Sequence, residues 1–351
     1  MTARTPFVSV VIRSRDEADR LRLTLASLEC QAADCEIVVV DDGSSDHTAE
    51  VVAEMARALP IVGVRHQVAQ GRSAASNAGA RAARGEVLLF QDGDTLFGPA
   101  ALAVHAALHA RTPGVIVRGE TMHLRGTRLF RDPESGAPWP DKAEAVARRP
   151  AAEIERMRVT MEQVRLGFAA IDGRAERGIY PGAGPRRLFE LEMDALANAP
   201  DCGVLWSAAS GSNLSVRRAE FLDAGGFNDA IDINEHRELA LRLVKRGGHL
   251  VPGTGARSYH MIHRSGWRDP LQDTAWEDAF LRSHPHPAVA LLTVFWASLS
   301  HASPVPKAYR IRSLPELKRA AAGATGLDYD VARRAIGARA MGAEFWQGDA
   351  A

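Results

Sequence analysis

Short β-branched runs alternate with helical patterns through the first hundred residues of the chain. The strand-like runs cover residues 8–12, 36–40, 61–64 and 86–90, and the segments between them have helical periodicity. The run at residues 36–40 does not alternate apolar with polar side chains, which is typical of a strand buried on both faces. This alternation predicts a parallel sheet covered by helices, with ligands bound beyond the carboxyl ends of the strands.

The pattern changes after these first elements. Residues 132–200 are rich in Arg, Glu, Ala and Pro and have no strand pattern, which predicts an inserted segment of helices and loops. Sheet-like runs return near residues 204–206 and 212–215, and the chain beyond residue 270 has a helical pattern. Within the 351 residues we therefore expect a main α/β domain over 1–270, interrupted at about 132–200, and a C-terminal helical extension over 271–351.

Charge and cysteine content narrow the range of partners. Lys plus Arg and Asp plus Glu number 43 each, so no net charge attracts nucleic acid or an anionic membrane. The three cysteines, at positions 30, 35 and 202, lack the spacing of a zinc site or a disulfide framework, which favours reduced thiols in a cytoplasmic protein. Residues 1–7 do not resemble a secretory signal.

The longest apolar run, residues 287–299, is shorter than the roughly 20 residues that a membrane-spanning helix needs. We interpret it as a buried helix and expect no transmembrane segment. An interfacial helix in peripheral contact with a membrane stays open as an alternative.

Two acidic turns follow predicted strands: residues 40–46 are VDDGSSD, and residues 90–95 are FQDGDT. In the second turn, Asp92 and Asp94 flank a single glycine, and such paired carboxylates suit Mg²⁺ or Mn²⁺ bound against a diphosphate. Either turn alone could be an ordinary polar turn that caps the next helix. Because both end strands of one sheet, together they predict a nucleotide-diphosphate cleft.

These turns belong to a series of motifs that resembles glycosyltransferase family two and its relatives of the GT-A fold. The motifs follow the family's order at residues 8–28, 38–48, 71–79, 92–94, 211–227 and 234–242. The resemblance covers roughly residues 8–265 and implies a Rossmann-like, mostly parallel sheet with helices on both faces. It also implies an enzyme that moves a hexosyl or N-acetylhexosaminyl group from a nucleotide-diphosphate sugar, with UDP favoured, to an acceptor.

The resemblance implies a set of donor-binding residues. Asp42 would face the nucleobase, Asp92 would lie near the ribose, and Arg13 or Asp16 would border the base. The other residues implied on the donor side are Gly43, Asn77, Gly93 and Arg264, the last as a partner of the departing diphosphate.

The resemblance implies that Asp94 holds the metal, as Mn²⁺ or Mg²⁺. A later histidine often completes the metal site in GT-A relatives, and residues 235–264 are also similar to polypeptide N-acetylgalactosaminyltransferases. That similarity points first to His260 and second to His263. The alternative is that both histidines belong to a polar loop at the edge of the sheet.

The catalytic base is the point at which the chain departs from the family. Many members have a Glu-Asp pair where this chain has Glu235 and His236. We expect Glu235 to act as the base, with His236 as second choice because an imidazole pKa of about 6.5 also suits proton transfer near neutrality. Base catalysis would give inversion, whereas the similarity to the retaining N-acetylgalactosaminyltransferases leaves retention open.

The acceptor side is less defined. Gly211 and Asn213 lie in the segment that matches the family's acceptor side, and Trp206 would either stack on a sugar ring or belong to the core. The acceptor itself, whether glycan, small molecule, lipid or peptide, is not identified by the sequence. We expect it to be recognised by residues 132–200 and by the helices beyond residue 270.

Two other functions fit part of the pattern. The altered acid pair would also suit a non-catalytic protein that binds sugar nucleotides or carbohydrates on the same fold. A nucleotidyltransferase would likewise place carboxylates and a metal on an α/β sheet, but it usually has a glycine-rich basic loop after the first strand, and residues 12–16 contain no glycine. A dinucleotide-binding dehydrogenase lacks support for the same reason.

Overall fold

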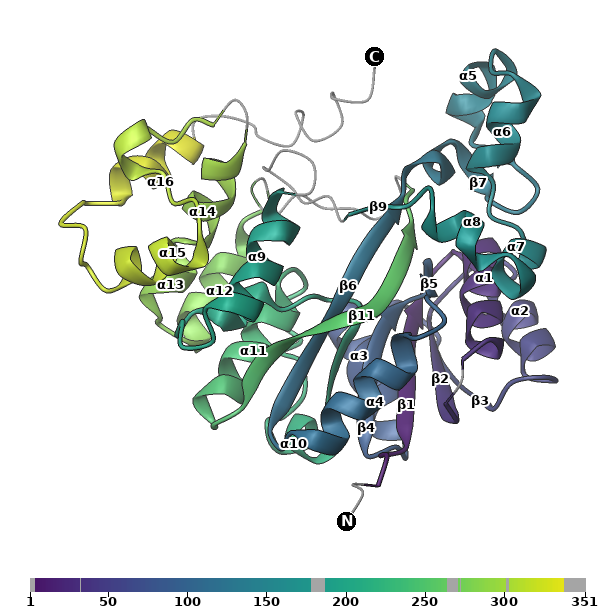
Figure 1. Ribbon diagram of the computed structural model, residues 1–351, viewed down its shortest axis with the longest axis horizontal. Coiled ribbons are helices and arrows are strands. Elements are labelled where there is room, and N and C mark those ends of the chain that lie inside the picture. Colours follow the sequence, from purple (N-terminus) through teal and green to yellow (C-terminus); the bar gives the residue numbers. More distant parts are fainter. Residues whose placement is uncertain are drawn as a thin grey trace. The chain divides into compact units, whose positions relative to one another are not determined.

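The computed structural model describes residues 4–31, 33–177, 187–263, 271, 273–300 and 303–337. The chain divides into two compact units that interleave along the sequence (Figure 1). The first unit comprises Met1–Glu176, Ser210–Phe227 and Gly253–Ser265, and the second comprises Arg177–Ala209, Asn228–Pro252 and Gly266–Ala351. The division into a main domain over residues 1–270 and a C-terminal extension over residues 271–351 remains a prediction.

A large mixed sheet forms the centre of the first unit. In the described part of the chain its order is β3-β2-β1-β4-β10-β6-β11-β5, with β9 beside β6. Strands β1 to β4 are parallel, whereas β10 is antiparallel to β4 and β6, and β5 is antiparallel to β11. The bounds are β1 Val8–Ser14, β2 Cys35–Asp42, β3 Ile61–His66, β4 Val87–Asp92, β5 Thr95–Phe97, β6 Val115–Leu124, β9 Glu176–Arg177, β10 Leu214–Arg217 and β11 His249–Met261.

Helices cover this sheet, and a two-stranded ribbon, β7 (Phe130–Asp132) with β8 (Ala137–Pro138), adjoins it in sequence. The helices of the first unit are α1 Ala18–Glu29, α2 Thr48–Met55, α3 Arg72–Ala82, α4 Ala101–Arg111, α5 Ala143–Ala147, α6 Ala151–Met157, α7 Met161–Leu166, α8 Phe168–Asp172 and α10 Arg218–Asp223, with 3₁₀ turns at Arg125–Leu129 and Pro140–Lys142.

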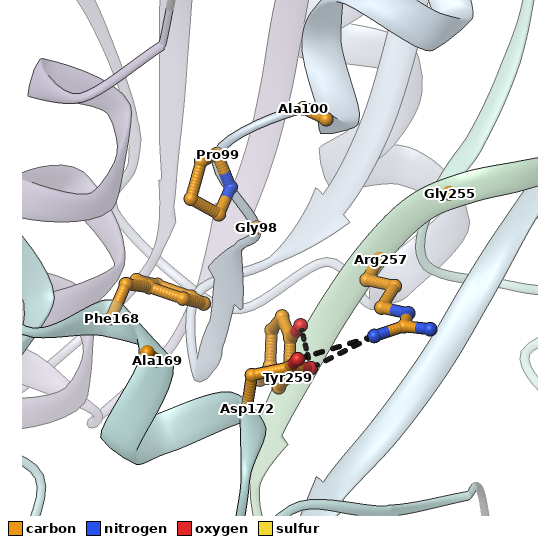
Figure 2. A pocket seen from close by; sticks show the side chains of 9 residues that line it. All are labelled: Gly98, Pro99, Ala100, Phe168, Ala169, Asp172, Gly255, Arg257 and Tyr259. Carbon is orange, nitrogen blue, oxygen red and sulfur yellow. Dashed lines mark hydrogen bonds and ion pairs between the residues drawn. The ribbon is translucent and has the colours of Figure 1, made fainter.

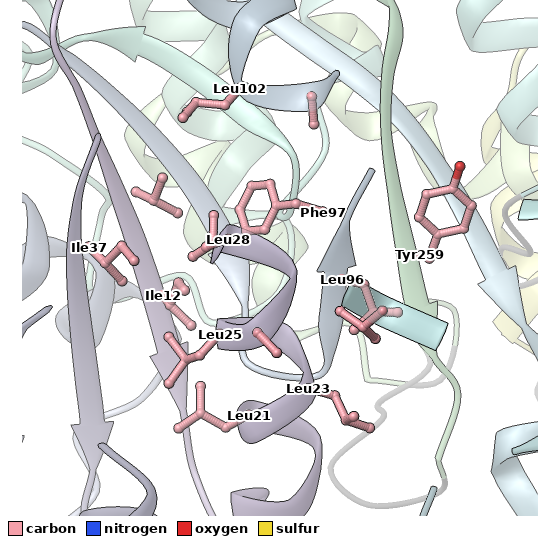
Figure 3. Close-up of a cluster of buried hydrophobic side chains, with 14 of the residues drawn as sticks. Ile12, Leu21, Leu23, Leu25, Leu28, Ile37, Leu96, Phe97, Leu102 and Tyr259 are labelled. Atoms are coloured by element: carbon pink, nitrogen blue, oxygen red, sulfur yellow. The ribbon is translucent and has the colours of Figure 1, made fainter. Parts of the chain in front are cut away.

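Two helices show how the sequence makes this packing possible. Leu21, Leu25 and Leu28 recur at helical spacing on α1 and pack against the apolar side chains of β1 and β2 (Figure 3). On the small-residue helix α3, a Cβ added at Gly79 would lie 2.5 Å from the Val11 side chain. Only glycine lets α3 approach the sheet this closely, and this approach holds the strand ends beside it in place.

The second unit is mainly helical in its described residues, with strand residues at Arg177 and at the start of β11. Its helices are α9 Arg187–Asn198, α11 Glu235–Lys245, α12 Ala275–Ser283, α13 Pro287–Ala290, α14 Leu292–Leu299, α15 Leu314–Ala321 and α16 Asp330–Gly337, with 3₁₀ turns at Leu205–Ala208 and Lys307–Tyr309. Trp206, Phe280 and Trp296 are buried in its core, and Arg237 stacks over the Trp296 ring at 5.0 Å.

Most local predictions are confirmed. The four predicted strands are β1 to β4, and the apolar run at 287–299 forms α13 and the fully buried α14. None of the described helices combines the length and the apolar character needed to cross a membrane. Residues 132–200 are mainly helical where described, but they contain the short strands β8 and β9, which were not expected.

One local prediction is wrong, and one strand was missed. Residues 205–208 form a 3₁₀ turn instead of sheet, because Trp206 and its neighbours are buried on consecutive positions in a helical core. The long strand β11 was not predicted. Pro252, Gly253 and Gly255 interrupt its pattern, and its pairing with β5 is formed with residues more than 150 positions earlier in the chain.

Candidate functional site

The two acidic turns meet at one edge of the sheet in the first unit, as predicted. Arg13 in β1 is in register with Asp92 in β4, and Ser14 is in register with Asp41 in β2. Arg13 Nε donates to Asp92 Oδ1 at 2.8 Å, and 35% of the Asp92 side chain remains exposed. The carboxyl ends of the parallel strands therefore bring a guanidinium and several carboxylates together at the place where α/β sheets bind ligands.

Asp94 lies with both predicted histidines. Asp94 Oδ2 is 3.2 Å from His260 Nε2 and 2.8 Å from His263 Nε2. One ligand atom from each of these residues, which we call the triad, lies within 4.8 Å of the others. The pairing of β5 with β11 brings them together, because His260 is opposite Thr95 and the Met261 amide donates to the Asp94 carbonyl at 2.9 Å.

The charges of the triad depend on one another. Burial favours neutral Asp94, but the charges and hydrogen bonds of His260 and His263 outweigh burial and hold the pKa of Asp94 well below its usual range. Burial likewise lowers the pKa of His263, yet hydrogen bonds to Asp94 and Glu17 raise it to about 9. At neutral pH an ionised Asp94 therefore lies beside a protonated His263.

Glu17, which the sequence analysis did not select, completes this cluster. Its Oε1 lies 2.9 Å from His263 Nε2, and its buried Oε2 has no hydrogen-bond partner among the described residues. Burial is the largest influence on Glu17 and raises its pKa. The hydrogen bond and charge of His263 oppose this effect, and repulsion from Asp94 adds to it. Its position three residues after β1, next to Asp16, is the signal that could have identified it.

The donor set of this cluster fits a divalent cation. One nitrogen of each histidine and the Asp94 carboxylate face one another, Glu17 joins them through His263, and the unpaired Glu17 oxygen is the kind of buried acceptor that a cation would satisfy. His123 closes the cluster on one side, with its ring edge against His260 at 5.2 Å. Burial and the charge of His260 lower the pKa of His123, so it lies beside the cluster as a neutral ring.

Residues 9–161 match the family model described as Glycosyl transferase family 2. These residues belong to glycosyltransferase family 2. The matched range includes Asp94 and Glu17, whereas His260 and His263 come from a later part of the same unit.

Curated relatives carry glycosyltransferase names. The chain is 37% identical over 315 residues to validoxylamine A glucosyltransferase of Streptomyces hygroscopicus subsp. jinggangensis, covering 84% of this chain and 64% of that protein. It is 38% identical over 96 residues to the putative glycosyltransferase EpsH of Bacillus subtilis, which is 27% of this chain and 28% of EpsH. The chain thus spans less than two thirds of both relatives.

One solved structure shows that this chain shares the GT-A fold. The mannosyltransferase PcManGT from Pyrobaculum calidifontis, in complex with GDP-Man and Mn²⁺, superposes with a TM-score of 0.52 at 18% identity. The superposition covers 95% of this chain and 80% of that chain. The expected mixed α/β architecture is therefore confirmed, whereas the similarity to polypeptide N-acetylgalactosaminyltransferases remains a prediction.

In the family 2 domain, Asp42 and Gly43 organise the loop after β3. Asp42 accepts hydrogen bonds from the amides of Gln70 and Gly71, and its Oδ1 lies 2.7 Å from His66 Nδ1. Gly43 has a φ of +76°, and a Cβ there would lie 2.7 Å from the Ala69 nitrogen. Both residues therefore shape the rim of the predicted nucleobase site.

Asp16 and Gly93 connect neighbouring strand ends. Asp16, at a φ of +52°, accepts from the Ser45 amide at 2.7 Å and thereby joins the loops after β1 and β2. That hydrogen bond lowers the pKa of Asp16. Gly93 leaves no room for a side chain, because a Cβ would lie 2.7 Å from Ser14 Oγ.

Two asparagines predicted at the site make architectural contacts in the first unit. Asn77 exchanges two hydrogen bonds with the backbone of Phe227, at 2.8 and 2.9 Å. Asn213 is fully buried at a φ of +58° and donates to the carbonyls of Glu120 and Ala256. Their roles toward donor and acceptor stay predictions, and Gly211 lies in the turn that precedes Asn213.

Asn213 also ends a chain of hydrogen bonds with His105, His109 and Ser215, which we call the buried histidine network. His109 Nε2 lies 2.8 Å from Ser215 Oγ, Ser215 Oγ lies 2.7 Å from His105 Nδ1, and His105 Nε2 lies 2.8 Å from Asn213 Oδ1. Because the Asn213 amide nitrogen donates elsewhere, its oxygen must accept from His105, so both ring nitrogens of His105 are paired, whereas the buried Nδ1 of His109 has no hydrogen-bond partner among the described residues.

Both candidates for the catalytic base, Glu235 and His236, lie in the second unit. Glu235 and His236 begin α11, with 3% and 14% of their side chains exposed, and Glu235 Oε2 is 3.6 Å from His236 Nδ1. Trp206 is buried in the same unit against Phe280. Arg264 lies outside the described residues.

Proposed function

We propose that this chain transfers a hexosyl or N-acetylhexosaminyl group from a nucleotide-diphosphate sugar to an acceptor. The observation that carries the proposal is the convergence of Asp94, His260 and His263 beside Asp92, within and next to a family 2 domain. The names of the curated relatives and the complex of PcManGT with GDP-Man and Mn²⁺ support the same class of donor.

The proposed metal site consists of the triad with Glu17 as a further carboxylate. Imidazole is a poor ligand for Mg²⁺, so a donor set with two histidines favours Mn²⁺ over Mg²⁺. A divalent cation held there would offset the charge that builds on the diphosphate leaving group. The chain's own contribution is to hold two imidazoles and two carboxylates in one place before the donor binds.

On the donor side we propose UDP as the nucleotide. Asp42 would face the base at the rim that Gly43 shapes, with Arg13 or Asp16 at its border, and Asp92 would meet the ribose through its exposed carboxylate edge. Gly93 would let the diphosphate approach the backbone, Asn77 would hold the helix beside it, and Arg264 would contact the diphosphate.

For the acceptor side we propose Glu235 as the base, with His236 second, and inversion as the outcome. The buried carboxylate of Glu235 at the start of α11 supports this choice, since a helix N-terminus stabilises the carboxylate that a base needs. Gly211, Asn213 and Trp206 would border the acceptor. The acceptor's identity is not part of the proposal.

A non-catalytic sugar-nucleotide-binding protein is the second function that we consider, because Glu235 is followed by His236 where many family members have an aspartate. Such a protein would keep the metal and nucleotide site but would not release UDP from a UDP-sugar. Donor hydrolysis by the purified protein therefore separates the two functions.

The test is thermal stability with UDP, GDP and TDP, each with and without Mn²⁺. Saturation at 100 times the dissociation constant stabilises a protein by about 2.7 kcal/mol. We expect one nucleotide to raise the Tm, and only when Mn²⁺ is present. No response to any nucleotide would refute the transfer function, and release of pyrophosphate from a nucleoside triphosphate would indicate a nucleotidyltransferase instead.

A further inference from the structure

A separate cavity of about 380 Å³ lies in the first unit, between residues 98–100, helix α8 and strand β11 (Figure 2). Its volume is within the roughly 300–1,000 Å³ typical of small-molecule sites. Gly255, Arg257 and Tyr259 line it from β11, and these alternate strand residues share one face. His260 points to the opposite face, so this cavity is distinct from the triad.

Charged groups form one side of the cavity. Arg257 Nη1 donates to Asp172 at 3.1 and 3.2 Å, and the Tyr259 hydroxyl donates to Asp172 Oδ1 at 2.6 Å. Arg257 Nε donates to Glu120 Oε2 at 3.3 Å. Asp172 and Arg257 line the cavity and neutralise each other, and Glu120, which pairs with Arg257 without lining the cavity, brings the net charge of the three groups to −1.

These groups keep hydrogen-bonding capacity toward the cavity. Asp172 Oδ1 accepts two hydrogen bonds, whereas Oδ2 accepts one and can accept another. Among the described residues, Arg257 Nη2 has no hydrogen-bond partner. About two fifths of both side chains are exposed, at 40% for Asp172 and 45% for Arg257. A donor and an acceptor therefore stand side by side at the rim.

The other side of the cavity is apolar. Figure 2 shows Phe168 and Pro99 across from Arg257, with Tyr259 and Asp172 between them. The Phe168 ring meets the Tyr259 ring edge-on at 5.1 Å and 74°, which fixes its orientation. A ligand in this cavity would thus lie with an apolar face on Phe168 and with polar groups on the Asp172–Arg257 pair.

We propose that this cavity is a second binding site, for a neutral saccharide unit. A sugar ring has C–H faces for Phe168 and neighbouring hydroxyls that donate to Asp172 and accept from Arg257. The net negative charge disfavours an anionic ligand. A wholly apolar ligand would remove water from the Arg257–Asp172 ion pair without replacing the lost hydrogen bonds, and this desolvation costs free energy. The inference rests on the cavity alone and does not require the proposed transfer reaction.

The test is saturation-transfer NMR with D-glucose, D-galactose, D-mannose and maltose, and with D-glucuronate and cyclohexanol as anionic and apolar probes. We expect at least one neutral sugar to bind. Phe168→Ala and Arg257→Gln should each weaken that binding by about tenfold. The control Leu166→Ala, which truncates an exposed side chain two residues before Phe168, should leave it unchanged.

Two further readouts separate this site from the triad. Asp94→Asn should leave sugar binding intact, and Phe168→Ala should leave the response to nucleotide and Mn²⁺ intact. The inference is overturned if no neutral sugar binds, if glucuronate or cyclohexanol binds more tightly than every sugar, or if Phe168→Ala and Arg257→Gln bind sugar as the wild type does. Sugar binding without any nucleotide response would uphold this site while refuting the proposed function.

Discussion

Two groups of histidines in the first unit have opposite chemistry. In the triad, His263 lies between Asp94 and Glu17, and its pKa rises to about 9. In the buried histidine network, burial dominates and lowers the pKa of His105 to about 4 and that of His109 to about 3. His263 is protonated beside its carboxylates and would release that proton on binding a cation, whereas the two histidines beside a hydroxyl and an amide stay neutral.

This comparison shows that the sequence spacing of two histidines does not by itself identify a metal site. His105 and His109 are four residues apart on α4, which places them on one helix face as in many metal sites. His260 and His263 are three residues apart at and beyond the end of a strand. Within the described part of the chain, the second pair has carboxylates within ion-pair distance and the first pair has none, and an anionic surrounding is what a cation requires.

The largest expected effect is on stability, in the buried histidine network. Asn213→Ala leaves His105 and two backbone carbonyls without their partners, which should lower the free energy of unfolding by about 3 kcal/mol or more. Urea unfolding measures this, and Mn²⁺ affinity of the folded variant should be unchanged. A loss of Mn²⁺ affinity would show that the two clusters are not separate.

The next effect is on metal binding by the triad. Asp94→Asn should weaken Mn²⁺ binding by more than about 100-fold, because loss of a residue that only supports a metal ligand already costs roughly 10–100-fold. Electron paramagnetic resonance of free Mn²⁺ measures the affinity. Asp223→Asn, an exposed carboxylate of the same unit, is the matched control. Equal Mn²⁺ affinity in both variants would remove Asp94 from the metal site.

Acid should destabilise the buried histidine network. Above pH 6.5 both histidines are neutral in the folded and the unfolded chain, so they do not change the free energy of unfolding. As the pH falls from 6.5 toward about 4, these histidines take up protons only in the unfolded chain, which lowers the stability of the folded state. Each histidine should then cost about 1.4 kcal/mol per pH unit. Urea unfolding between pH 7.5 and 5 should show a flatter slope for His109→Gln.

His249→Gln, at an exposed position, should leave the same slope unchanged. If His109→Gln and His249→Gln have identical pH profiles, His109 is not the neutral group that the network requires.

The smallest effect should come from Glu17. Glu17→Gln keeps the shape but removes the second carboxylate, and we expect Mn²⁺ affinity to fall by about tenfold, within the range for groups around a metal. Calorimetric titration with Mn²⁺ measures it, and Glu50→Gln, an exposed residue of α2, serves as control. Unchanged affinity in Glu17→Gln would leave Glu17 as a partner of His263 only.

The sequence alone predicted the positions of several candidate residues through strand ends. A short, continuous apolar run such as residues 36–40 indicates a strand buried on both faces. The polar residues that follow it must then lie at the carboxyl edge of the sheet. Asp42, Asp92 and Asp94 follow from this reasoning. Glu17 was missed because an acidic residue at the start of a helix is also what ordinary helix capping favours.

The local sequence determined the βα rhythm, the strand ends and the glycines at Gly43, Gly79 and Gly93, because periodicity and side-chain size act between near neighbours. Tertiary structure decided which histidines meet Asp94. His263 lies 169 residues away from it and reaches it through the pairing of β5 with β11, which no local pattern encodes. The same structure placed His105 and His109 against Ser215 and Asn213, since long-range strand pairing alone sets which polar groups share a buried space.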